Sequence, residues 1–454
     1  MIDFNLTEEQ ALLQKTAKNF AEKEIAPAAE EIEKMDPGKY TPWDKVRPIF
    51  KKAAGLGLMS ILIPEEFGGG GLGCIDNVLI MEEMSVADMG IASSYFNLSI
   101  TAPRLILVGA TPEQRVKWLK DITSADDHVI SCAGSEADQA GSDSLCPIPD
   151  PKFGMRTFAR KDGDSYVING TKSAFITNAG AAKYYFVIAR TDLNKPQMES
   201  TAIFYVPANT PGLSIGKRTH LIGWKTAMNA EVYLDDLRVP KEWRLGGEAG
   251  EFLPLFIMQG LPFIGTGFAG NHVGLARAAY EYALQYSKER VSWGQPIIKH
   301  QLVTSMLADM WVNYQTARLL TWDAAHTVDS GSMMAPIKSA AAKTYASDVA
   351  RLNAENCVRI LGSYGITMEY KAQKYLSDAW IGYSCDGTNQ MLRLHMFWML
   401  SGEFGPPPGA GGPNSGMAGG PPAGFGGPPP GFGPPPGGFG GGPPDFGPPA
   451  GSRK

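Results

Sequence analysis

The sequence predicts an α+β protein in which two helical regions flank a central β-domain and a glycine- and proline-rich tail follows. Three observations support this prediction. Apolar residues recur at helical spacing in the first and third regions, β-branched and aromatic residues cluster between them, and helix-breaking residues crowd the end of the chain. The 454 residues are 44% hydrophobic, enough for a large packed core. The predicted parts are an N-terminal helical domain (1–120), a β-barrel or sandwich-like domain (121–240), a second helical domain (241–401) and a disordered tail (402–454).

The N-terminal helical region opens with a predicted capping box. The Thr7 hydroxyl and the Gln10 side chain have the spacing at which each accepts a hydrogen bond from the other's backbone N–H, ahead of an apolar-periodic run. The later segment GLGLMSILIP ends at Pro64, and Gly68 to Gly71 then predict a turn. These glycines do not form a G-x-G-x-x-G dinucleotide fingerprint after a strand.

In the central region the residue composition becomes typical of β-strands. The segments SYVING, YYFVIART and STAIFYVP are rich in β-branched and aromatic residues, and Asp-Gly, Asn-Gly and Pro-Gly pairs lie between such runs. The region that follows returns to helical spacing. Leu275, Ala279 and Tyr282 share one helix face, and Met310 and Tyr314 share another one helix later, which predicts the core of a helical bundle.

Charge and cysteine usage exclude several classes of protein. The net charge is −5, and no basic stretch is typical of nucleic-acid binding. No run of 18 apolar residues predicts a membrane span, and the first residues lack a signal-peptide pattern. The five cysteines are scattered without C-x-x-C spacing, which favours a reducing cytoplasm over a disulfide framework. The six histidines lack metal-ligand spacing, so we expect no metal site.

The tail concentrates the helix breakers of the chain. Between Gly402 and Gly451 lie 20 of the 53 glycines and 16 of the 34 prolines, so we expect neither a helix nor a core there. Four phenylalanines recur every seven residues, each followed by glycine: Phe425, Phe432, Phe439 and Phe446. Two interpretations stay open, namely a flexible low-complexity extension and a set of aromatic contacts on a proline-rich spacer.

Two segments carry a family resemblance. The first reads AGSEADQAGSD from Ala133 to Asp143, and the second reads RILGSYGITMEYKAQKYLSD from Arg359 to Asp378. With IPEEFGGGGLG, INGTKSAFITNAG and LDDLRVP, they resemble the acyl-CoA dehydrogenase family of flavoproteins over roughly residues 1–400. The resemblance implies a helical N-terminal domain, a central β-domain, a C-terminal four-helix bundle, FAD as cofactor and a homotetramer.

The same resemblance implies which residues hold FAD. Ser135 and Ser142 would contact the cofactor, although the loop between them is one residue longer than the family's usual pattern. Phe175 would cover the flavin ring, and the Thr177 hydroxyl would lie near N5. The residues expected to complete the cofactor site, several of them on the FAD of a neighbouring subunit, are Arg290, Trp293, Gln301, Arg359, Gly362, Thr388 and Gln390.

The family's chemistry removes an α-proton from an acyl-CoA while a hydride leaves the β-carbon for flavin N5. The base is a carboxylate in a dry site. Asp386 stands in the base position of the segment CDGTNQ, and Cys385 replaces the family's tyrosine. The alternative base position of some branched-chain members holds Gly260 here. Asp88 is the second candidate.

The pocket residues narrow the substrate. Aspartate is about 1–1.5 Å shorter than glutamate, a difference large enough to misplace a base. We therefore expect the small Cys385 to admit a branched or cyclic α-carbon near Asp386. Ala92 stands where glutaryl-CoA members carry arginine, which disfavours a dicarboxylic substrate. The resemblance implies an electron-transferring flavoprotein as acceptor. The alternatives are an enoyl-CoA reductase and a non-catalytic flavin- or CoA-binding protein.

Overall fold

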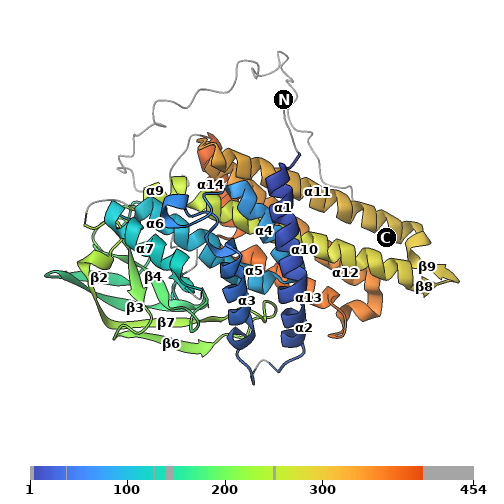
Figure 1. The fold of residues 1–454 in the computed structure, drawn as a ribbon, viewed down its shortest axis with the longest axis horizontal. Helices are drawn as coiled ribbons and strands as arrows, with labels where there is room; N and C mark the ends of the chain where they lie inside the picture. The colour runs from blue at the N-terminus through green and yellow to red at the C-terminus, as the bar shows by residue number, and fades with distance from the viewer. Residues whose placement is uncertain (1–4, 37, 127, 140–147, 249–251, 402–454) are drawn as a thin grey trace, which may run out of the picture. The chain divides into compact units, whose positions relative to one another are not determined.

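The computed structural model describes residues 5–36, 38–126, 128–139, 148–248 and 252–401. The N-terminal region is helical, as predicted (Figure 1). Thr7 accepts a hydrogen bond from the Gln10 N–H at 3.1 Å and donates its own N–H to the Gln10 side chain at 3.2 Å, which confirms the capping box. The helices are α1 (Glu8–Phe20), α2 (Ala26–Glu33), α3 (Trp43–Gly55), α4 (Cys74–Ala87), α5 (Met89–Phe96), α6 (Ala102–Gly109) and α7 (Pro112–Ser124), with π-helical turns η1 (Ala21–Ile25) and η4 (Asn97–Thr101).

The central region forms a sheet, and the three predicted strand segments coincide with strands β3, β4 and β5. In the described part of the chain one sheet has seven strands, in the order β1-β4-β2-β3-β7-β6, with β5 paired to β4 outside that path (Figure 1). The register of β3 against β7 is irregular between Lys172 and Ile176. The strands are β1 (Ile130–Ala133), β2 (Phe158–Asp162), β3 (Ser165–Thr177), β4 (Tyr184–Arg190), β5 (Thr201–Pro207), β6 (Leu213–Arg218) and β7 (Asn229–Pro240), with the short α8 (Gln197–Ser200) between β4 and β5.

Long helices form the C-terminal region, and α10 packs against α4, α11 and α12. The predicted core faces are confirmed: Leu275 and Ala279 of α10 and Met310 and Tyr314 of α11 are buried. Within the described residues, no helix is both long and apolar enough to cross a membrane. The elements are α9 (Phe252–Gln259), α10 (Leu261–Glu289), β8 (Val291–Ser292), β9 (Gln295–Pro296), α11 (Gln301–Asp329), α12 (Ala335–Leu361), α13 (Ala372–Ser384) and α14 (Asn389–Ser401).

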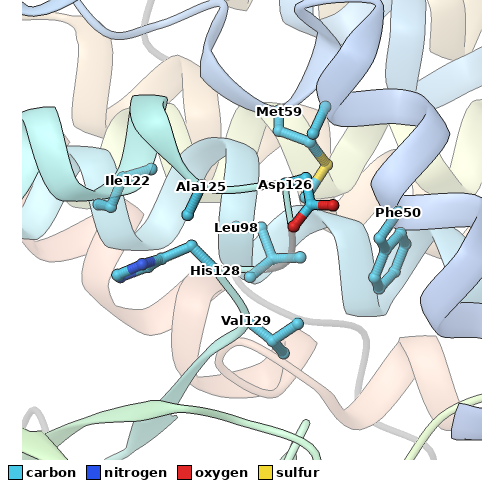
Figure 2. Close-up of a pocket in the computed structure, with 9 residues that line it drawn as sticks. Phe50, Met59, Leu98, Ile122, Ala125, Asp126, His128 and Val129 are labelled. Atoms are coloured by element: carbon cyan, nitrogen blue, oxygen red, sulfur yellow. The ribbon is translucent and has the colours of Figure 1, made fainter.

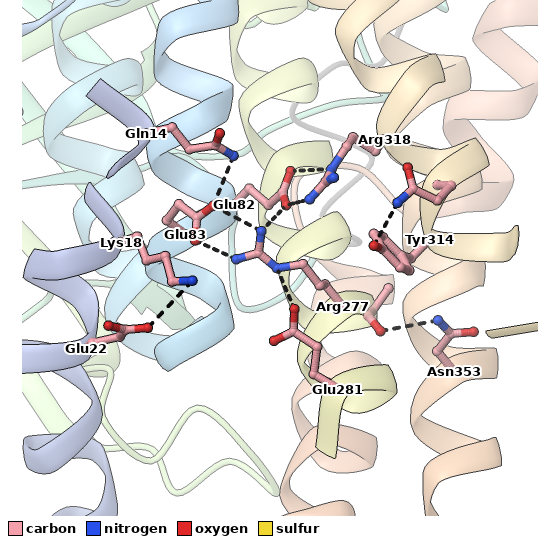
Figure 3. Close-up of polar contacts among 12 residues, drawn as sticks. Gln14, Lys18, Glu22, Glu82, Glu83, Arg277, Glu281, Tyr314, Arg318 and Asn353 are labelled. Atoms are coloured by element: carbon pink, nitrogen blue, oxygen red, sulfur yellow. Dashed lines mark hydrogen bonds and ion pairs between the residues drawn. The ribbon is translucent and has the colours of Figure 1, made fainter. Parts of the chain in front are cut away.

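A buried charge network joins two helices of the N-terminal region to α10 and α11 of the C-terminal region (Figure 3). Glu82 and Glu83 of α4 are almost fully buried. Arg277 of α10 donates to Glu82 at 2.7 Å and to Glu83 at 3.0 Å, and Arg318 of α11 donates its Nε to Glu82 at 3.0 Å. Gln14 of α1 donates to Glu83 at 3.0 Å. Because a buried charge is costly unless paired, these contacts fix how α1, α4, α10 and α11 pack.

Candidate active site

A cavity of about 770 Å³ lies where the sheet meets the helices. Its walls come from parts of the chain that are far apart in sequence: η4, β1, the end of β3, α10, α12 and the loop between α13 and α14. Of the residues that the sequence assigned to the site, the cavity brings together Ser135, Phe175, Thr177, Asp386 and Thr388. Its volume falls within the range of about 300–1,000 Å³ that is usual for cofactor and ligand sites.

The end of β3 and the segment after β1 form one wall. The Ser173 N–H donates to the Ser135 carbonyl at 2.9 Å, which holds Ser135 against β3. The irregular register of β3 leaves Phe175 with 65% of its side-chain surface exposed, and this residue lines the cavity. The Thr177 hydroxyl donates to Asn229 Oδ1 at 3.2 Å, and its carbonyl accepts from Ser131 at 2.6 Å. A ring and a hydroxyl are thus presented along one side of the cavity.

The α13–α14 loop carries Asp386 into the cavity. Asp386 has φ 49° and Gly387 has φ 86°, so two successive residues adopt left-handed backbone. Such a conformation is uncommon for aspartate and easy for glycine. The Thr388 hydroxyl accepts the Met391 N–H at 3.4 Å at the start of α14. The chain therefore turns sharply at the residue that was predicted to be the base.

Asp386 lines the cavity from the loop between α13 and α14, and the residue is exposed. Desolvation by the surrounding protein raises the pKa of its carboxyl group to about 6, and Lys343 opposes that rise. Burial also raises the pKa of the neighbouring Cys385 and Cys132 thiols to about 12, so both are neutral at pH 7. Of the three carboxylates that line the cavity, Glu136 pairs with Lys172 and Glu231 accepts a hydrogen bond from Tyr233.

Lys343 of α12 also lines this cavity, although the sequence analysis did not select it. The side chain is fully buried. Its Nζ donates to the Gly387 carbonyl at 2.8 Å, to Asn389 Oδ1 at 3.1 Å and to the Tyr383 carbonyl at 3.5 Å. A lysine inside the otherwise small-residue segment SAAAKTYAS was the available sequence signal.

Asp88, the second candidate for the base, occupies a different environment. It caps α5, and its Oδ1 accepts the Ile91 N–H at 2.7 Å and the Thr226 hydroxyl at 2.5 Å. Its Oδ2 lies 2.9 Å from Lys374 Nζ. Asp88 does not belong to the described residues that line the cavity. Both carboxylate oxygens are engaged in holding the fold.

Several expected cofactor residues lie away from the cavity, where the β8–β9 hairpin meets the end of α12. The Arg290 guanidinium carbon lies 5.4 Å from the centre of the Tyr364 ring, and Trp293 is 95% exposed. Arg359 donates to Asn356 at 3.1 Å, which occupies part of its guanidinium. Gln301 is the first residue of α11, and Gly362 follows the last residue of α12. Gln390 is exposed on α14. Ser142 lies outside the described residues.

A second cavity of about 20 Å³ lies between α3, η4 and the segment before β1 (Figure 2). Asp126 and His128 line it. Asp126 pairs with Lys51 at 3.0 Å, and His128 Nε2 lies 2.7 Å from the Tyr205 hydroxyl. The volume suits about one water molecule, so this cavity is too small for a substrate.

Three family models match the chain in order along its length. The N-terminal, middle and C-terminal domains of acyl-CoA dehydrogenase match residues 7–126, 131–237 and 256–397. The chain belongs to the acyl-CoA dehydrogenase family. It is an oxidoreductase of that family, and members of the family use FAD. The family resemblance seen in the sequence is thereby confirmed.

Individual relatives agree with this assignment. The chain is 36% identical to the short-chain specific acyl-CoA dehydrogenase, mitochondrial, of Homo sapiens, over 86% of this chain and 89% of that protein. The structure of butyryl-CoA dehydrogenase from Megasphaera elsdenii is 31% identical with a TM-score of 0.80, covering 88% of this chain and 100% of that one. A solved chain described under "Electron transferring flavoprotein of Acidaminococcus fermentans" is 34% identical with a TM-score of 0.79, covering 88% and 99%.

The cavity residues fit FAD. The Trp224 indole N–H and the Ser93 and Thr101 hydroxyls line the cavity, are buried and have no hydrogen-bond partner in the described part of the chain. Buried polar groups normally have partners, so these atoms suit a polar cofactor or substrate. The exposed Phe175 offers a flat apolar surface beside the Thr177 hydroxyl. Trp224 and Lys343 are the site residues that the sequence analysis missed.

Proposed function

We propose that this chain oxidises an acyl-CoA thioester to the enoyl-CoA, with Asp386 as the base. The supporting observation is that Asp386 lines the same cavity as the β3 residues expected at the flavin. Of the three carboxylates that line it, Glu136 pairs with Lys172 and Glu231 accepts a hydrogen bond from Tyr233, whereas the Asp386 carboxylate has no hydrogen bond or ion pair within the described residues. The Asp386 carboxylate takes the α-proton, the β C–H bond breaks with its electron pair, and a carbon–carbon double bond forms. FAD, when bound, accepts that hydride at N5.

The chain's own residues prepare this step. Ser135, Phe175, Thr177 and Thr388 line the cavity where they would hold and cover the cofactor. The burial that raises the pKa of Asp386 to about 6 strengthens it as a base while leaving it ionised at pH 7. With cofactor and substrate bound, the mostly apolar walls would leave little room for water, which protects the charge transfer from side reactions.

The acyl group is proposed to be branched or cyclic at the α-carbon. Aspartate reaches about 1–1.5 Å less far than glutamate, so the α-carbon must lie closer to the loop. Cys385 beside Asp386 leaves room for such a substituent. Ala92 of α5 offers no charge to a distal carboxylate. A short straight acyl group is the second candidate, because relatives are named short-chain and butyryl-CoA dehydrogenases.

Anaerobic mixing of the flavin-loaded protein with saturated acyl-CoAs tests this proposal. The panel spans straight, branched, cyclic and dicarboxylic acyl groups, and the flavin absorbance near 450 nm is followed. Bleaching by a branched or cyclic member supports the short-base argument, and Asp386→Glu should then shift the preference toward straight chains. Bleaching by butyryl-CoA alone favours the second candidate. No bleaching by any member would contradict the oxidation and favour the reductase direction.

An electron-transferring flavoprotein as acceptor and a homotetramer belong to the same proposal. A similar chain is described as an electron transferring flavoprotein. The hairpin end exposes Trp293, Leu302 and Ile366 at 95%, 83% and 75%, a surface suited to a second copy. Sedimentation of the wild type and Trp293→Ala tests the assembly, because the variant should dissociate and lose flavin. We also propose a cytoplasmic location, which fits the four free cysteines of the described residues.

A further inference from the structure

Lys343 is a buried cation whose contacts all lead to the loop of Asp386. Its side chain is 0% exposed, and it extends from α12 to the segment between α13 and α14. The Gly387 carbonyl, one residue after Asp386, accepts its shortest hydrogen bond at 2.8 Å. Fully buried lysines are rare unless they are paired or used. The contacts therefore call for a functional explanation.

The loop needs such an anchor. Asp386 and Gly387 both have positive φ, at 49° and 86°, and a left-handed aspartate persists only where its surroundings impose it. Asn389, a second contact of Lys343, donates to the Thr344 carbonyl at 3.2 Å and to Ser347 at 2.8 Å. The loop is thus fastened to α12 on both sides of Thr388.

Lys343 forms no ion pair within the described residues, and Asp386 is the carboxylate that acts most strongly on its charge. Asp348 of α12 is already paired with Arg393 of α14. Burial, followed by the charge of Lys343, lowers the pKa of His272 on α10 to about 3, so this ring is neutral. Other ionisable groups that face the site are Cys132 and Cys385, both neutral at pH 7, and Lys172 on β3, which pairs with Glu136 at 3.2 Å. His395 on α14, whose pKa burial lowers, and Glu231 on β7, which accepts a hydrogen bond from Tyr233, also line the cavity.

We infer that Lys343 is a positioning residue for the reaction: it anchors the Asp386 loop through the Gly387 carbonyl and keeps the Asp386 carboxylate ionised by its charge. The inference rests on the proposed role of Asp386 as the base. Desolvation raises the pKa of Asp386 and the charge of Lys343 lowers it, so Lys343 increases the fraction of Asp386 that is ionised near pH 7. Lys343 itself transfers no proton to or from the substrate.

The pH range in which the site is active follows from the pKa values of Asp386 and Lys343. Burial raises the pKa of Asp386 to about 6 against the effect of Lys343. Burial lowers the pKa of Lys343 to about 8, and Asp386 opposes that fall. Between about pH 6 and 8 both groups are charged, and flavin reduction should be fastest there. Below that range the base is lost, and above it the anchor is lost.

Three substitutions separate the two parts of the role. Lys343→Met removes the charge and the donor, Lys343→Gln removes the charge but keeps a donor for the Gly387 carbonyl, and Lys343→Arg keeps the charge. Lys338→Met is the matched control on the same helix, since Lys338 is partly exposed and pairs with Asp323 at 2.8 Å. The readout is the rate of anaerobic flavin reduction between pH 5 and 10, per bound flavin.

The neutral variants should shift the acid limb of this profile upward by about one pH unit or more, equivalent to a tenfold loss or more near pH 6. They should also lose the alkaline limb. Lys343→Gln should keep a higher plateau than Lys343→Met, and the control should match the wild type. A uniform, pH-independent loss in the neutral variants would overturn the inference. If neither neutral variant binds flavin, the pH profiles of the wild type and of Lys343→Arg decide. A wild-type profile without an acid and an alkaline limb overturns the inference. A wild-type profile with both limbs, together with an alkaline limb at higher pH in Lys343→Arg, supports it.

Failure of the proposed function looks different. If Asp386→Asn keeps its rate of flavin reduction, the base assignment is wrong whatever the Lys343 variants do. If Asp386→Asn is inactive while the Lys343 variants keep a wild-type pH profile, the base stands and the inference about Lys343 is wrong.

Discussion

Two buried lysines, Lys343 and Lys374, meet carboxylates in different surroundings. Lys343 lines a cavity together with Asp386, whose charge acts on it without an ion pair between them. Lys374 of α13 lies 2.5 Å from Asp378, 2.9 Å from Asp88 and 3.8 Å from Glu33, in a closed cluster. Burial alone would lower the pKa of Lys374, but three carboxylates raise it well above its usual value. The pKa of Lys343 falls because a single carboxylate compensates less.

The comparison teaches how to tell a catalytic aspartate from a structural one. The oxygens of Asp88 are committed to Ile91, Thr226 and Lys374. Asp378 likewise accepts the Trp224 N–H at 2.7 Å. Asp386 lines the cavity, and its carboxylate has no hydrogen bond or ion pair within the described residues. A base needs that open side, because it must come within hydrogen-bond reach of the proton that it removes.

The largest expected effect comes from Asp386→Asn. The variant loses the base but keeps its shape, so flavin reduction by the best acyl-CoA should fall by about 10²–10⁴-fold. Flavin content should stay at the wild-type level. Stopped-flow absorbance near 450 nm measures both. If Asp386→Asn reduces its flavin as fast as the wild type, Asp386 is not the base, and the surroundings of Lys343 and Lys374 do not separate a catalytic aspartate from a structural one.

Lys374→Met should act on stability instead. It leaves Asp88, Asp378 and Glu33 buried near one another without their shared cation, which should cost about 3–5 kcal/mol of unfolding free energy. Urea denaturation with flavin fluorescence measures the loss. Reduction per bound flavin should stay within about threefold of the wild type, since Lys374 makes no contact with the Asp386 loop. A rate loss as large as that of Asp386→Asn would argue against a purely structural cluster.

Asp88→Asn should have a smaller effect of the same kind. The amide keeps one acceptor for the Ile91 N–H but weakens the pairing of Lys374, so we expect a loss of about 1–3 kcal/mol in unfolding free energy. The reduction rate per flavin should be nearly unchanged. Loss of turnover with intact flavin content would instead identify Asp88 as the base.

The smallest effect concerns stability against pH. The pKa of Asp378 and of Asp386 is raised to about 6, in both cases by burial. The native state therefore binds more protons than the unfolded state between about pH 4 and 6, and these groups make stability fall as pH rises through that range. Asp386→Asn should flatten this dependence by at most about 1–2 kcal/mol, because the cavity admits water. An identical slope in the variant and the wild type would contradict the raised pKa of Asp386.

The sequence predicted the fold more completely than the site. Local signals sufficed for the capping box at Thr7, for strands β3 to β5 and for the helix faces of α10 and α11, because each depends on residues close in the chain. Family motifs located Asp386, Phe175 and Thr177. Lys343 was missed because its role depends on a contact with Gly387, 44 residues later, and a lone lysine in a helix is typical of a solvated face.

The cavity also shows what sequence could not supply. No sequence motif marks Trp224, and only the folded chain brings its indole N–H to the cavity. The sequence also could not predict the partners of Asp88, because Lys374 and Thr226 come from distant segments of the chain. Predicting burial and pairing requires knowing which helices pack together.

The span of the cavity wall has a consequence for biosynthesis. Its lining begins at Ser93 and ends at Met399. At about 5–20 residues per second, a ribosome needs roughly 15–60 seconds to make the intervening chain. The N-terminal helices and the sheet thus wait, with their cavity faces uncovered, until α14 has emerged. The complete cavity, with every wall that a bound flavin would contact, exists only in a chain whose translation is nearly finished.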